Sequence, residues 1–351
     1  MPYEGILYDK LPEKSVRCRL CAHFCTIRNG KRGICGVREN RNGTLYSLVY
    51  GKLIANHVDP IEKKPLFHFQ PGTLSSSIAT AGCNMSCKHC QNYQISIQAA
   101  QLDPMPGEES TPTEVVKSAL KTGCSSISYT YTEPTIFMEF ARDCALEAVN
   151  HGLSNVFVTN GFMSEESATL AGNFLDAANI DLKGATEDHY RHICGASLQP
   201  VLDTIKHLYQ AGVWIEVTTL VIPGYNDDEA TFEFISSFLV SLDPKIPWHI
   251  SRFFPTYKML DVPPTPYASI EKAMRIGEKS GLKYVYPGNI PGISDETKCS
   301  GCGNVLIQRT GFSAKLVHLT ENGTCSKCGK DFDGRMGKPD TKSSVHSPED
   351  Q

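Results

Sequence analysis

The sequence predicts an α/β protein built on a parallel sheet, and three observations indicate this fold class. Short apolar segments alternate with helical segments about six times between residues 75 and 287. Clusters of polar residues come directly after several of these segments, where parallel sheets bind ligands. The 14 cysteines fall mostly into three close-set groups, which lie before, at the start of and after the repeating region. We therefore expect a central α/β region, open or closed into a barrel, between two cysteine-rich segments.

The individual elements follow from apolar spacing and from capping residues. A short strand at 77–81 leads into Gly82 and the first cysteine of the central group. Thr111-Pro112-Thr113-Glu114 predicts a helix start, with a threonine cap, a proline in the first turn and a glutamate that closes the capping box. The later elements are expected as strands at 126–129, 155–159, 179–182, 214–222 and 248–252, with helices at 137–149 and 270–279 among those between them.

Changes in composition divide the chain into four parts. The first segment is short, polar and rich in turns, and its Asn42-Gly43 pair lies between two strand-like stretches, which predicts a hairpin with a type I′ turn. A module of about 70 residues often needs a staple, which the cysteines can supply. We expect a cysteine-rich module at 1–72, the α/β core at 73–295, a four-cysteine module at 296–334 and a disordered polar tail at 335–351.

The overall composition excludes several classes of protein. The 351 residues are 40% hydrophobic and 21% charged, which is an ordinary globular balance. The formal charge of −4 gives no basic field for nucleic acid or an anionic membrane. No apolar run approaches the ~20 residues of a membrane-spanning helix, and the first residues lack a signal-peptide core, so we expect a soluble, cytoplasmic protein. In such a protein, close-set cysteines favour metal binding over disulfides.

The central cysteines have the spacing of an iron–sulfur site. Cys83, Cys87 and Cys90 form a C-x3-C-x2-C pattern directly after a predicted strand and glycine. Three thiolates on one short loop can bind three corners of a cubic cluster and leave the fourth iron open for a substrate. Two alternatives explain the same pattern, a zinc knuckle that borrows a distant histidine or cysteine and three reduced thiols without metal.

At this point the sequence resembles a known family. The C-x3-C-x2-C spacing is that of the radical S-adenosylmethionine (radical SAM) enzymes. Further motifs are similar to the radical SAM member of the AmmeMemoRadiSam system and, more distantly, to the activating enzymes of glycyl-radical enzymes such as pyruvate formate-lyase. These motifs are CRLCAHFCTIRNGKRGICGVREN, DPIEKKPLFHF, ATAGCNMSCKHCQN, SYTYTEPT, VTNGF, NIDLKG and the C-terminal pair CSGC and CSKC, and they span nearly the whole chain except its tail.

The resemblance implies a fold and a reaction. It implies a partial (β/α)6-type barrel whose Cys83, Cys87 and Cys90 hold a [4Fe–4S] cluster. The reduced cluster would cleave SAM to methionine and a 5′-deoxyadenosyl radical, which abstracts hydrogen from a protein or small-molecule substrate. The enzyme would be an oxidoreductase-type, activating-enzyme-like protein. The partners implied are SAM, a reductant such as flavodoxin or ferredoxin, and Memo-type and AMMECR-type proteins.

The resemblance also assigns residues to SAM. His89 occupies the position of an aromatic ring that lies against the adenine. Glu133 matches the acid that holds the SAM amino group, although Tyr131 and Thr132 replace the usual pair of glycines. The full set of expected SAM contacts is His89, Thr132, Glu133, Asn160, Asp181, Lys183, Ile222 and Gly224.

Structural roles explain the same residues. Glu133 can complement a helix dipole, Asp181 and Lys183 can form a buried ion pair, and Asn160-Gly161 can be an ordinary turn. The segment from Ile222 to Gly224 is also typical of a strand end followed by a turn. Three further residues lie at the last strand and either reach substrate or SAM or serve the core or surface: His249, Arg252 and Tyr257.

The flanking cysteine groups predict two more metal sites. Cys299-x2-Cys302 and Cys325-x2-Cys328 form two knuckles, each followed by a glycine, which is typical of a zinc ribbon with a closed structural zinc. A rubredoxin-like iron site has the same spacing. The N-terminal group can hold zinc or a second iron–sulfur cluster, and its members are Cys18, Cys21, Cys25 and Cys35. The remaining cysteines, Cys124, Cys144 and Cys194, are expected to be buried apolar residues.

Two rival functions stay open at this stage. The nearer one is a glycyl-radical enzyme activase proper, for which a protein partner would acquire the radical. The more distant one is a non-catalytic electron carrier or an adaptor with iron–sulfur and zinc sites, which would need no SAM. The α/β repeat with polar strand ends is superfluous for such a carrier, and the C-terminal segment lacks the dense basic stripe of a nucleic-acid adaptor.

Overall fold

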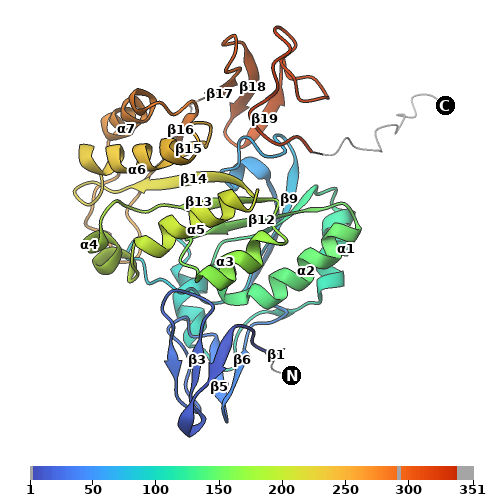
Figure 1. The fold of residues 1–351 in the computed structure, drawn as a ribbon, viewed down its shortest axis with the longest axis vertical. Helices are drawn as coiled ribbons and strands as arrows, with labels where there is room; N and C mark the ends of the chain where they lie inside the picture. Colours follow the sequence, from blue (N-terminus) through green and yellow to red (C-terminus); the bar gives the residue numbers. More distant parts are fainter. Residues whose placement is uncertain (1–2, 291–293, 338–351) are drawn as a thin grey trace, which may run out of the picture.

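The computed structural model describes residues 3–290 and 294–337 and contains one large sheet (Figure 1). Its strand order is β16-β15-β14-β13-β12-β11-β9-β8, and all neighbours are parallel except the antiparallel pair β8 and β9. The strands are β8 (Ala55–Pro60), β9 (Leu74–Ala79), β11 (Ser126–Tyr129), β12 (Ser154–Thr159), β13 (Ala177–Asp181), β14 (Trp214–Val221), β15 (Trp248–Arg252) and β16 (Val285–Gly288). Within the described residues β8 and β16 each pair on one side, so the sheet is an open, partial barrel as expected.

Helices connect the parallel strands and line the outer face of the curved sheet (Figure 1). Neighbouring helices pack in pairs, α1 with α2, α3 with α5 and α6 with α7. The α-helices are α1 (Pro112–Lys121), α2 (Met138–Asn150), α3 (Glu165–Gly172), α4 (Glu187–His189), α5 (Gln199–Gln210), α6 (Glu229–Leu242) and α7 (Tyr267–Ser280). Short 3-10 and π turns supplement them at η1 (Pro12–Lys14), η2 (Ile61–Lys63), η3 (Gln94–Gln98), η4 (Ala99–Gln101), η5 (Pro134–Phe137) and η6 (Tyr190–Cys194).

Most predicted elements are confirmed, and the first strand shows why one boundary was wrong. The capping box at Thr111 and the strands at 126–129 and 248–252 lie where the sequence placed them. Strand β9 begins at Leu74 and ends at Ala79, whereas apolar spacing predicted 77–81. Its early residues are buried serines, and Ser75 Oγ lies 2.6 Å from Ser128 Oγ on the next strand. Small hydroxyl side chains that pair inside a barrel leave no apolar pattern to detect.

The N-terminal module consists of two small antiparallel sheets. One contains β1 (Tyr3–Glu4), β6 (Thr44–Ser47) and β5 (Arg38–Arg41), and the other contains β2 (Tyr8–Lys10), β3 (Val16–Cys18) and β4 (Thr26–Ile27). Asn42 and Gly43 have φ angles of 55° and 86° between β5 and β6, which confirms the predicted type I′ hairpin. A further pair joins β7 (Lys52–Leu53) to β10 (Glu108–Glu109).

The N-terminal module packs at the carboxyl ends of the barrel strands. Cys21 bridges Met163, which lies just after β12, and Arg19 pairs with Glu166 at the start of α3. These contacts place the first cysteine group on the same side of the sheet as the loop that carries the central group.

The C-terminal module lies at the opposite end of the molecule from the N-terminal module (Figure 1). It contains β17 (Ser294–Lys298), β18 (Val305–Thr310) and β19 (Ser313–Leu316). Arg309 of β18 inserts into the core and donates to the Phe67 carbonyl at 2.6 Å. The tail expected from residue 335 falls mostly outside the described residues, and Arg335 donates its backbone N–H to the His68 carbonyl at 2.7 Å. Within the described ranges, no helix has the length and apolarity that crossing a membrane requires.

Candidate functional site

The central cysteine loop begins where β9 ends. Gly82 adopts a φ of 104°, and Cys83, Cys87 and Cys90 follow on one loop. Each sulfur has a neighbouring polar group of its own. Cys83 accepts from the Met85 N–H at 3.4 Å and Asn160 Nδ2 at 3.6 Å, the Cys87 thiol neighbours the Cys194 thiol, and Cys90 lies 3.2 Å from Ser96 Oγ. Hydrogen bonds to sulfur tune the potential of iron–sulfur clusters, so these neighbours suit cluster ligands.

The spacing of these sulfurs separates the central loop from a single-ion site. A single metal ion needs at least three Cys, His, Asp or Glu ligand atoms close to one another. Among residues 3–290 and 294–337, only the four C-terminal cysteines have such atoms within 4.8 Å of one another. Cys83, Cys87 and Cys90 are therefore spread too widely to close on one ion. On a four-iron cluster each cysteine binds a different iron atom, which requires wider spacing. The donor set fits a [4Fe–4S] cluster.

His89 is buried within this loop and has an unsatisfied ring nitrogen. Its side chain lies between the second and third cysteines in sequence, and Nδ1 has no hydrogen-bond partner among the described residues. Burial lowers the pKa of His89 to about 3, so the ring is neutral near pH 7. A buried polar atom without a partner costs roughly 1–3 kcal/mol, which a bound ligand can recover. This orphaned atom fits the predicted contact with SAM.

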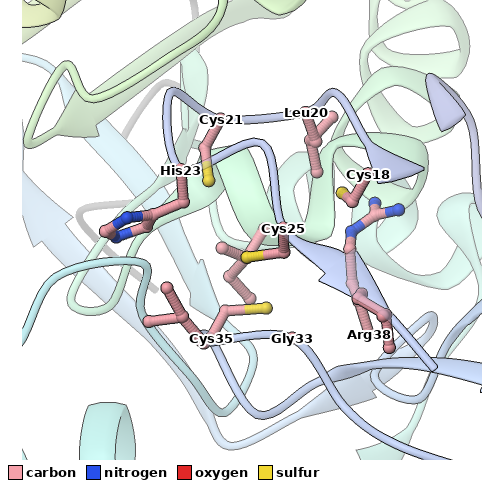
Figure 2. Close-up of a pocket in the computed structure, with 11 residues that line it drawn as sticks. Cys18, Leu20, Cys21, His23, Cys25, Gly33, Cys35 and Arg38 are labelled. Atoms are coloured by element: carbon pink, nitrogen blue, oxygen red, sulfur yellow. The ribbon is translucent and has the colours of Figure 1, made fainter. Parts of the chain in front are cut away.

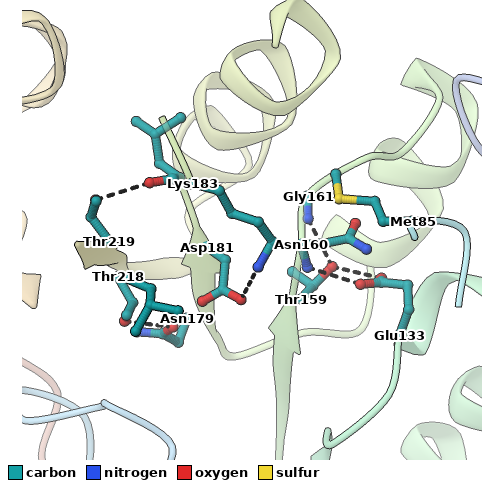
Figure 3. Close-up of polar contacts among 12 residues, drawn as sticks. Met85, Glu133, Thr159, Asn160, Gly161, Asn179, Asp181, Lys183, Thr218 and Thr219 are labelled. Atoms are coloured by element: carbon teal, nitrogen blue, oxygen red, sulfur yellow. Dashed lines mark hydrogen bonds and ion pairs between the residues drawn. The ribbon is translucent and has the colours of Figure 1, made fainter. Parts of the chain in front are cut away.

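Glu133 is fully buried, and the protein itself satisfies most of its carboxylate. Oε1 accepts from the Thr135 N–H at 3.0 Å. Oε1 also accepts from the Thr159 hydroxyl at 2.7 Å, and Oε2 accepts from the Asn160 N–H at 2.8 Å (Figure 3). Burial raises the pKa of Glu133. Because Asn160 also donates to the Cys83 sulfur, Glu133 fixes the end of β12 against the cluster loop. Glu133 also caps the N-terminus of η5, the structural role that the sequence left open. Its Oε2 keeps one acceptor position for a ligand.

Thr132 ties its segment to the end of β9. Its hydroxyl donates to the Thr80 carbonyl at 2.8 Å, so that group is occupied within the protein. The preceding Tyr131 has a φ of 62°, a left-handed conformation that its ring contacts and its hydrogen bond to Asp59 hold in place. The departure from the usual glycines therefore produces a rigid turn at this point.

Asp181 and Lys183 lie at the end of β13 and form an ion pair. Lys183 Nζ lies 2.6 Å from Asp181 Oδ2, and both side chains are partly buried (Figure 3). Burial opposes the charged form of Lys183, but the Asp181 carboxylate and the Cys87 sulfur raise its pKa well above the ordinary value. The sequence left open an Asp181–Lys183 ion pair in place of SAM contacts. This ion pair forms, and it lies beside the cluster loop.

The structure connects Ile222 to this site and leaves Gly224 at its periphery. Asn226 Oδ1 accepts from the Ile222 N–H at 2.6 Å, and Asn226 Nδ2 donates to the Lys183 carbonyl at 2.9 Å. Gly224 is exposed, and its N–H donates to Asp227 at 2.8 Å. The carboxyl ends of β13 and β14 are therefore locked together by Asn226.

The residues near the last strand divide between two places. His249 is buried and its Nε2 lies 2.7 Å from Glu216 Oε2, away from the cysteine loop. Arg252 donates to the Thr265 carbonyl at 2.7 Å. Tyr257 stacks on Tyr93, which follows the cysteine loop, with ring centroids 4.4 Å apart. Of the three, only Tyr257 lies beside the loop.

Two functional neighbours were not found from the sequence. Cys194 was expected to be a buried apolar residue; it is fully buried, and its thiol neighbours that of Cys87. Backbone contacts from Ser86 to Cys194 and from Lys88 to Ile193 hold η6 against the cluster loop at 2.9 Å each. Asn226 was also missed. Both lie far from their partners in sequence, so no local spacing reveals them.

The C-terminal cysteines form a compact tetrahedral set. The sulfurs of Cys299 and Cys328 are 3.6 Å apart, and those of Cys302 and Cys325 are 3.7 Å apart. Tetrahedral coordination with metal–sulfur bonds of about 2.3 Å requires sulfurs about 3.8 Å apart. The four thiols thus fit one metal ion, either zinc or iron. Gly303 and Gly329 have φ angles of 72° and 73°, as the predicted knuckles require.

The N-terminal cysteines surround a different kind of space. All four contribute to the lining of one small cavity, together with His23 and Arg38 (Figure 2). No three of their sulfurs lie within 4.8 Å of one another, whereas all four C-terminal sulfurs do. Their arrangement is therefore not that of a closed single-ion site.

Several known proteins are similar to this chain. The uncharacterized protein MJ0808 of Methanocaldococcus jannaschii is 46% identical over 333 residues, covering 94% of this chain and 98% of that protein. The pyruvate formate-lyase 1-activating enzyme of Escherichia coli is 22% identical over 224 residues, 58% of this chain and 89% of the enzyme. A solved radical SAM methyltransferase from Sphaerobacter thermophilus has a TM-score of 0.49 and 15% identity, covering 68% of this chain and 71% of that chain.

The family assignment rests on the segment that carries the cysteine loop. The model of the Radical SAM superfamily matches residues 77–235, which run from β9 into α6. This range includes the central cysteine loop, Glu133, Asn160 and the Asp181–Lys183 pair. The chain belongs to the radical SAM superfamily, with similarity to pyruvate formate-lyase activating enzymes.

Proposed function

We propose that this protein is a radical SAM enzyme whose Cys83, Cys87 and Cys90 hold a [4Fe–4S] cluster with one iron open to SAM. When bound, the cluster supplies one electron for the cleavage of SAM to methionine and a 5′-deoxyadenosyl radical, which takes a hydrogen atom from the substrate. Two observations at one place carry this proposal. Three cysteine sulfurs at the carboxyl end of the sheet are spread beyond single-ion spacing, and the neighbouring His89 has a buried nitrogen without a partner among the described residues.

The chain's own residues would orient the ligands and SAM. Asn160 positions the Cys83 sulfur, and Glu133 holds Asn160 in place. His89 offers its neutral ring to the adenine. The partly exposed Asp181 carboxylate, fixed by Lys183, and the free acceptor position on Glu133 are suited to the cationic SAM amino group. Ile222 and Gly224 would border the adenine.

The similarity to activating enzymes suggests a narrower function. We propose membership of the AmmeMemoRadiSam system, on the motifs quoted above, with Memo-type and AMMECR-type proteins as partners and a flavodoxin or ferredoxin as the reductant. The substrate is then either a protein, as for a glycyl-radical activase, or a small molecule. Formation of a stable protein radical in a partner would indicate the first, and turnover without one would indicate the second.

An electron carrier is the second candidate, and Cys194 is the observation that favours it. A fourth thiol beside the loop would close the cluster if it bound the fourth iron. However, the Cys194 thiol neighbours the Cys87 thiol, so it lies at the corner of the cluster that Cys87 would already bind. We therefore rank SAM cleavage first.

Anaerobic SAM cleavage tests the proposal. The protein is reconstituted with iron and sulfide and reduced with dithionite, and 5′-deoxyadenosine and methionine are quantified. We expect product from the wild type and from Cys124→Ala, a buried cysteine outside every group, and none from the Cys83/Cys87/Cys90→Ala triple variant. Equal product from the triple variant would contradict the cluster assignment. No product from a wild type with a loaded, reducible cluster would favour the electron carrier.

The C-terminal cysteines would hold a structural zinc. Four thiols at tetrahedral spacing close the coordination sphere and leave no position for a substrate. Metal analysis of the protein purified without added iron tests this, with one zinc per chain expected and a rubredoxin-type iron spectrum as the contrary result.

A further inference from the structure

The N-terminal cysteines converge although the sequence spreads them over 18 positions. Cys18 ends β3, and its N–H donates to the Cys25 carbonyl at 2.9 Å, which holds the backbones of these two cysteines side by side. Cys21 is held by its bridge to Met163. Figure 2 shows all four cysteines around the same space, a cavity of about 20 Å³. Its remaining lining is mostly aliphatic, so the thiols face an enclosed, apolar space.

The sulfur spacing resembles that of the central loop and differs from that of the C-terminal module. No three of these thiols lie within 4.8 Å of one another, whereas all four C-terminal sulfurs do. Four cysteines spread beyond single-ion spacing instead fit a polynuclear cluster, in which each thiolate binds its own iron.

Arg38 supplies an independent observation that a ligand belongs in this cavity. Its guanidinium is 1% exposed, lines the cavity and lies beside the Cys18 sulfur (Figure 2). Nη2 donates to the Glu139 carboxylate at 2.5 Å, which balances the charge. Nε and Nη1 are buried and have no hydrogen-bond partner among the described residues. Buried donors without acceptors are costly, and the inorganic and cysteine sulfurs of a cluster are acceptors.

The cavity adjoins the central cysteine loop. A Cβ at Gly82 would lie 3.1 Å from the Cys35 carbonyl oxygen and 2.6 Å from Val37 Cγ1, so only glycine permits this approach immediately before Cys83. On the other side, His23 lines the cavity and its Nε2 lies 2.7 Å from the Asn84 carbonyl. The backbone that carries one cysteine group is thus in direct contact with the backbone that carries the other.

We propose that Cys18, Cys21, Cys25 and Cys35 hold a second iron–sulfur cluster, fully ligated by cysteine, that passes single electrons to the cluster at Cys83, Cys87 and Cys90. A low-potential one-electron carrier protein of the flavodoxin or ferredoxin class reduces the second cluster. The electron then moves across the Cys35–Gly82 contact, which reoxidises the second cluster and reduces the central one. The site itself stands on its own observations, and only the electron acceptor rests on the proposed function.

Metal analysis of the full chain tests the site without any assay of activity. The Cys83/Cys87/Cys90→Ala variant is reconstituted anaerobically, and its iron, acid-labile sulfide and zinc are counted. We expect about two to four irons with matching sulfide, together with an electron paramagnetic resonance signal on reduction. Two zinc ions and no iron, or no metal beyond the C-terminal ion, would overturn the proposal. Cys21→Ser in an otherwise native chain should lose the same amount of iron, and Cys124→Ala should lose none.

Arg38 tests whether the cluster occupies this cavity. Arg38→Lys keeps a cation for Glu139 but removes the two free donors. In the triple-alanine background it should shift the reduction potential of the remaining cluster to a more negative value, since hydrogen bonds to sulfur raise the potential. An unchanged potential would place the cluster elsewhere.

The electron-transfer step has a separate readout. With the carrier protein as reductant, SAM cleavage in Cys21→Ser should fall relative to the same variant reduced by dithionite, which reaches the central cluster directly. An unchanged ratio would overturn the relay. A triple variant that retains iron while the wild type fails to cleave SAM would refute the proposed function and leave the second cluster intact.

Discussion

The two ends of the large sheet carry similar buried side chains in different states of hydrogen bonding. At the amino ends, Glu216 accepts from the Phe67 and His68 N–H groups at 2.9 and 2.7 Å and lies 2.7 Å from His249 Nε2. Both ring nitrogens of His68 have partners, the Asp333 carbonyl and Tyr286 Oη at 2.6 and 2.7 Å. Every polar side-chain atom of Glu216 and His68 therefore has a partner, and these two residues form the centre of a closed network.

At the carboxyl ends the network stays incomplete. His89 Nδ1 has no partner among the described residues, the Asp181 carboxylate is partly exposed, and the thiols of Cys83, Cys87 and Cys90 are not spaced for one ion. A buried histidine thus stabilises the fold where both its nitrogens are bonded and indicates a ligand where one is not. The comparison teaches that hydrogen-bond completeness, more than residue type, separates the structural His68 from His89 beside the cysteine loop.

The largest expected effect comes from removing one cysteine at each end. Cys87→Ala should abolish SAM cleavage and keep the C-terminal metal, because the cluster loses a ligand. Cys325→Ala should lose that metal and lower the thermal unfolding temperature, because the module that carries Arg309 loses its staple. Product, metal content and unfolding temperature are measured for both. SAM cleavage at the wild-type rate by Cys87→Ala would contradict the assignment of the carboxyl end as the functional end.

Breaking the closed network should affect stability alone. Glu216→Gln removes a buried charge that accepts several hydrogen bonds, so the free energy of unfolding should fall by about 3–5 kcal/mol. Urea unfolding measures this change. SAM cleavage per folded molecule should stay at the wild-type level, and a selective loss of cleavage would show that the amino end also serves the reaction.

The pH dependence of stability sharpens the same contrast. Burial lowers the pKa of His68 to about 4 from the ordinary 6.5, so between these values the unfolded chain binds a proton that the folded protein excludes. Stability from this group is complete above pH 6.5 and is lost as the pH falls toward 4. From pH 6.5 to pH 4.5 the loss amounts to about 2–3 kcal/mol. Urea unfolding at both pH values measures this: the free energy of unfolding of the wild type should fall by about 2–3 kcal/mol more than that of His68→Gln. An equal fall in the two proteins would mean that folding does not lower the pKa of His68.

The smallest effect is expected at Cys194. Its thiol assists Cys87 but is not needed as a ligand, so Cys194→Ala should keep the cluster and most of the SAM cleavage. The midpoint potential of the cluster should become slightly more negative, because the thiol beside the Cys87 sulfur is lost. Loss of the cluster in this variant would instead make Cys194 a fourth ligand and favour the electron carrier.

The sequence predicted the features that depend on local spacing. The C-x3-C-x2-C loop after a strand, the four-cysteine knuckles and the Asn42-Gly43 hairpin are all encoded within a few residues, and the structure reproduces each. The placement of Glu133 and Lys183 at strand ends was also predictable, because parallel strands end at one edge of a sheet.

Features that depend on distant contacts could not be predicted in this way. Cys194 meets Cys87 across more than 100 residues, and the donors that satisfy Glu133 come partly from the next strand. Glu216 has no spacing that marks it as the centre of a network, since its donors come from the segment before β9 and from β15. Burial and partner geometry, which only the fold determines, decide these roles.

The most direct test of the open-iron assignment is the electron paramagnetic resonance spectrum of the reduced protein before and after SAM is added. The wild-type spectrum should change on addition of SAM, because SAM binds an iron of the central cluster. The signal that remains in the Cys83/Cys87/Cys90→Ala variant should not change. A wild-type spectrum that is identical with and without SAM would contradict the assignment of the carboxyl end as the SAM site.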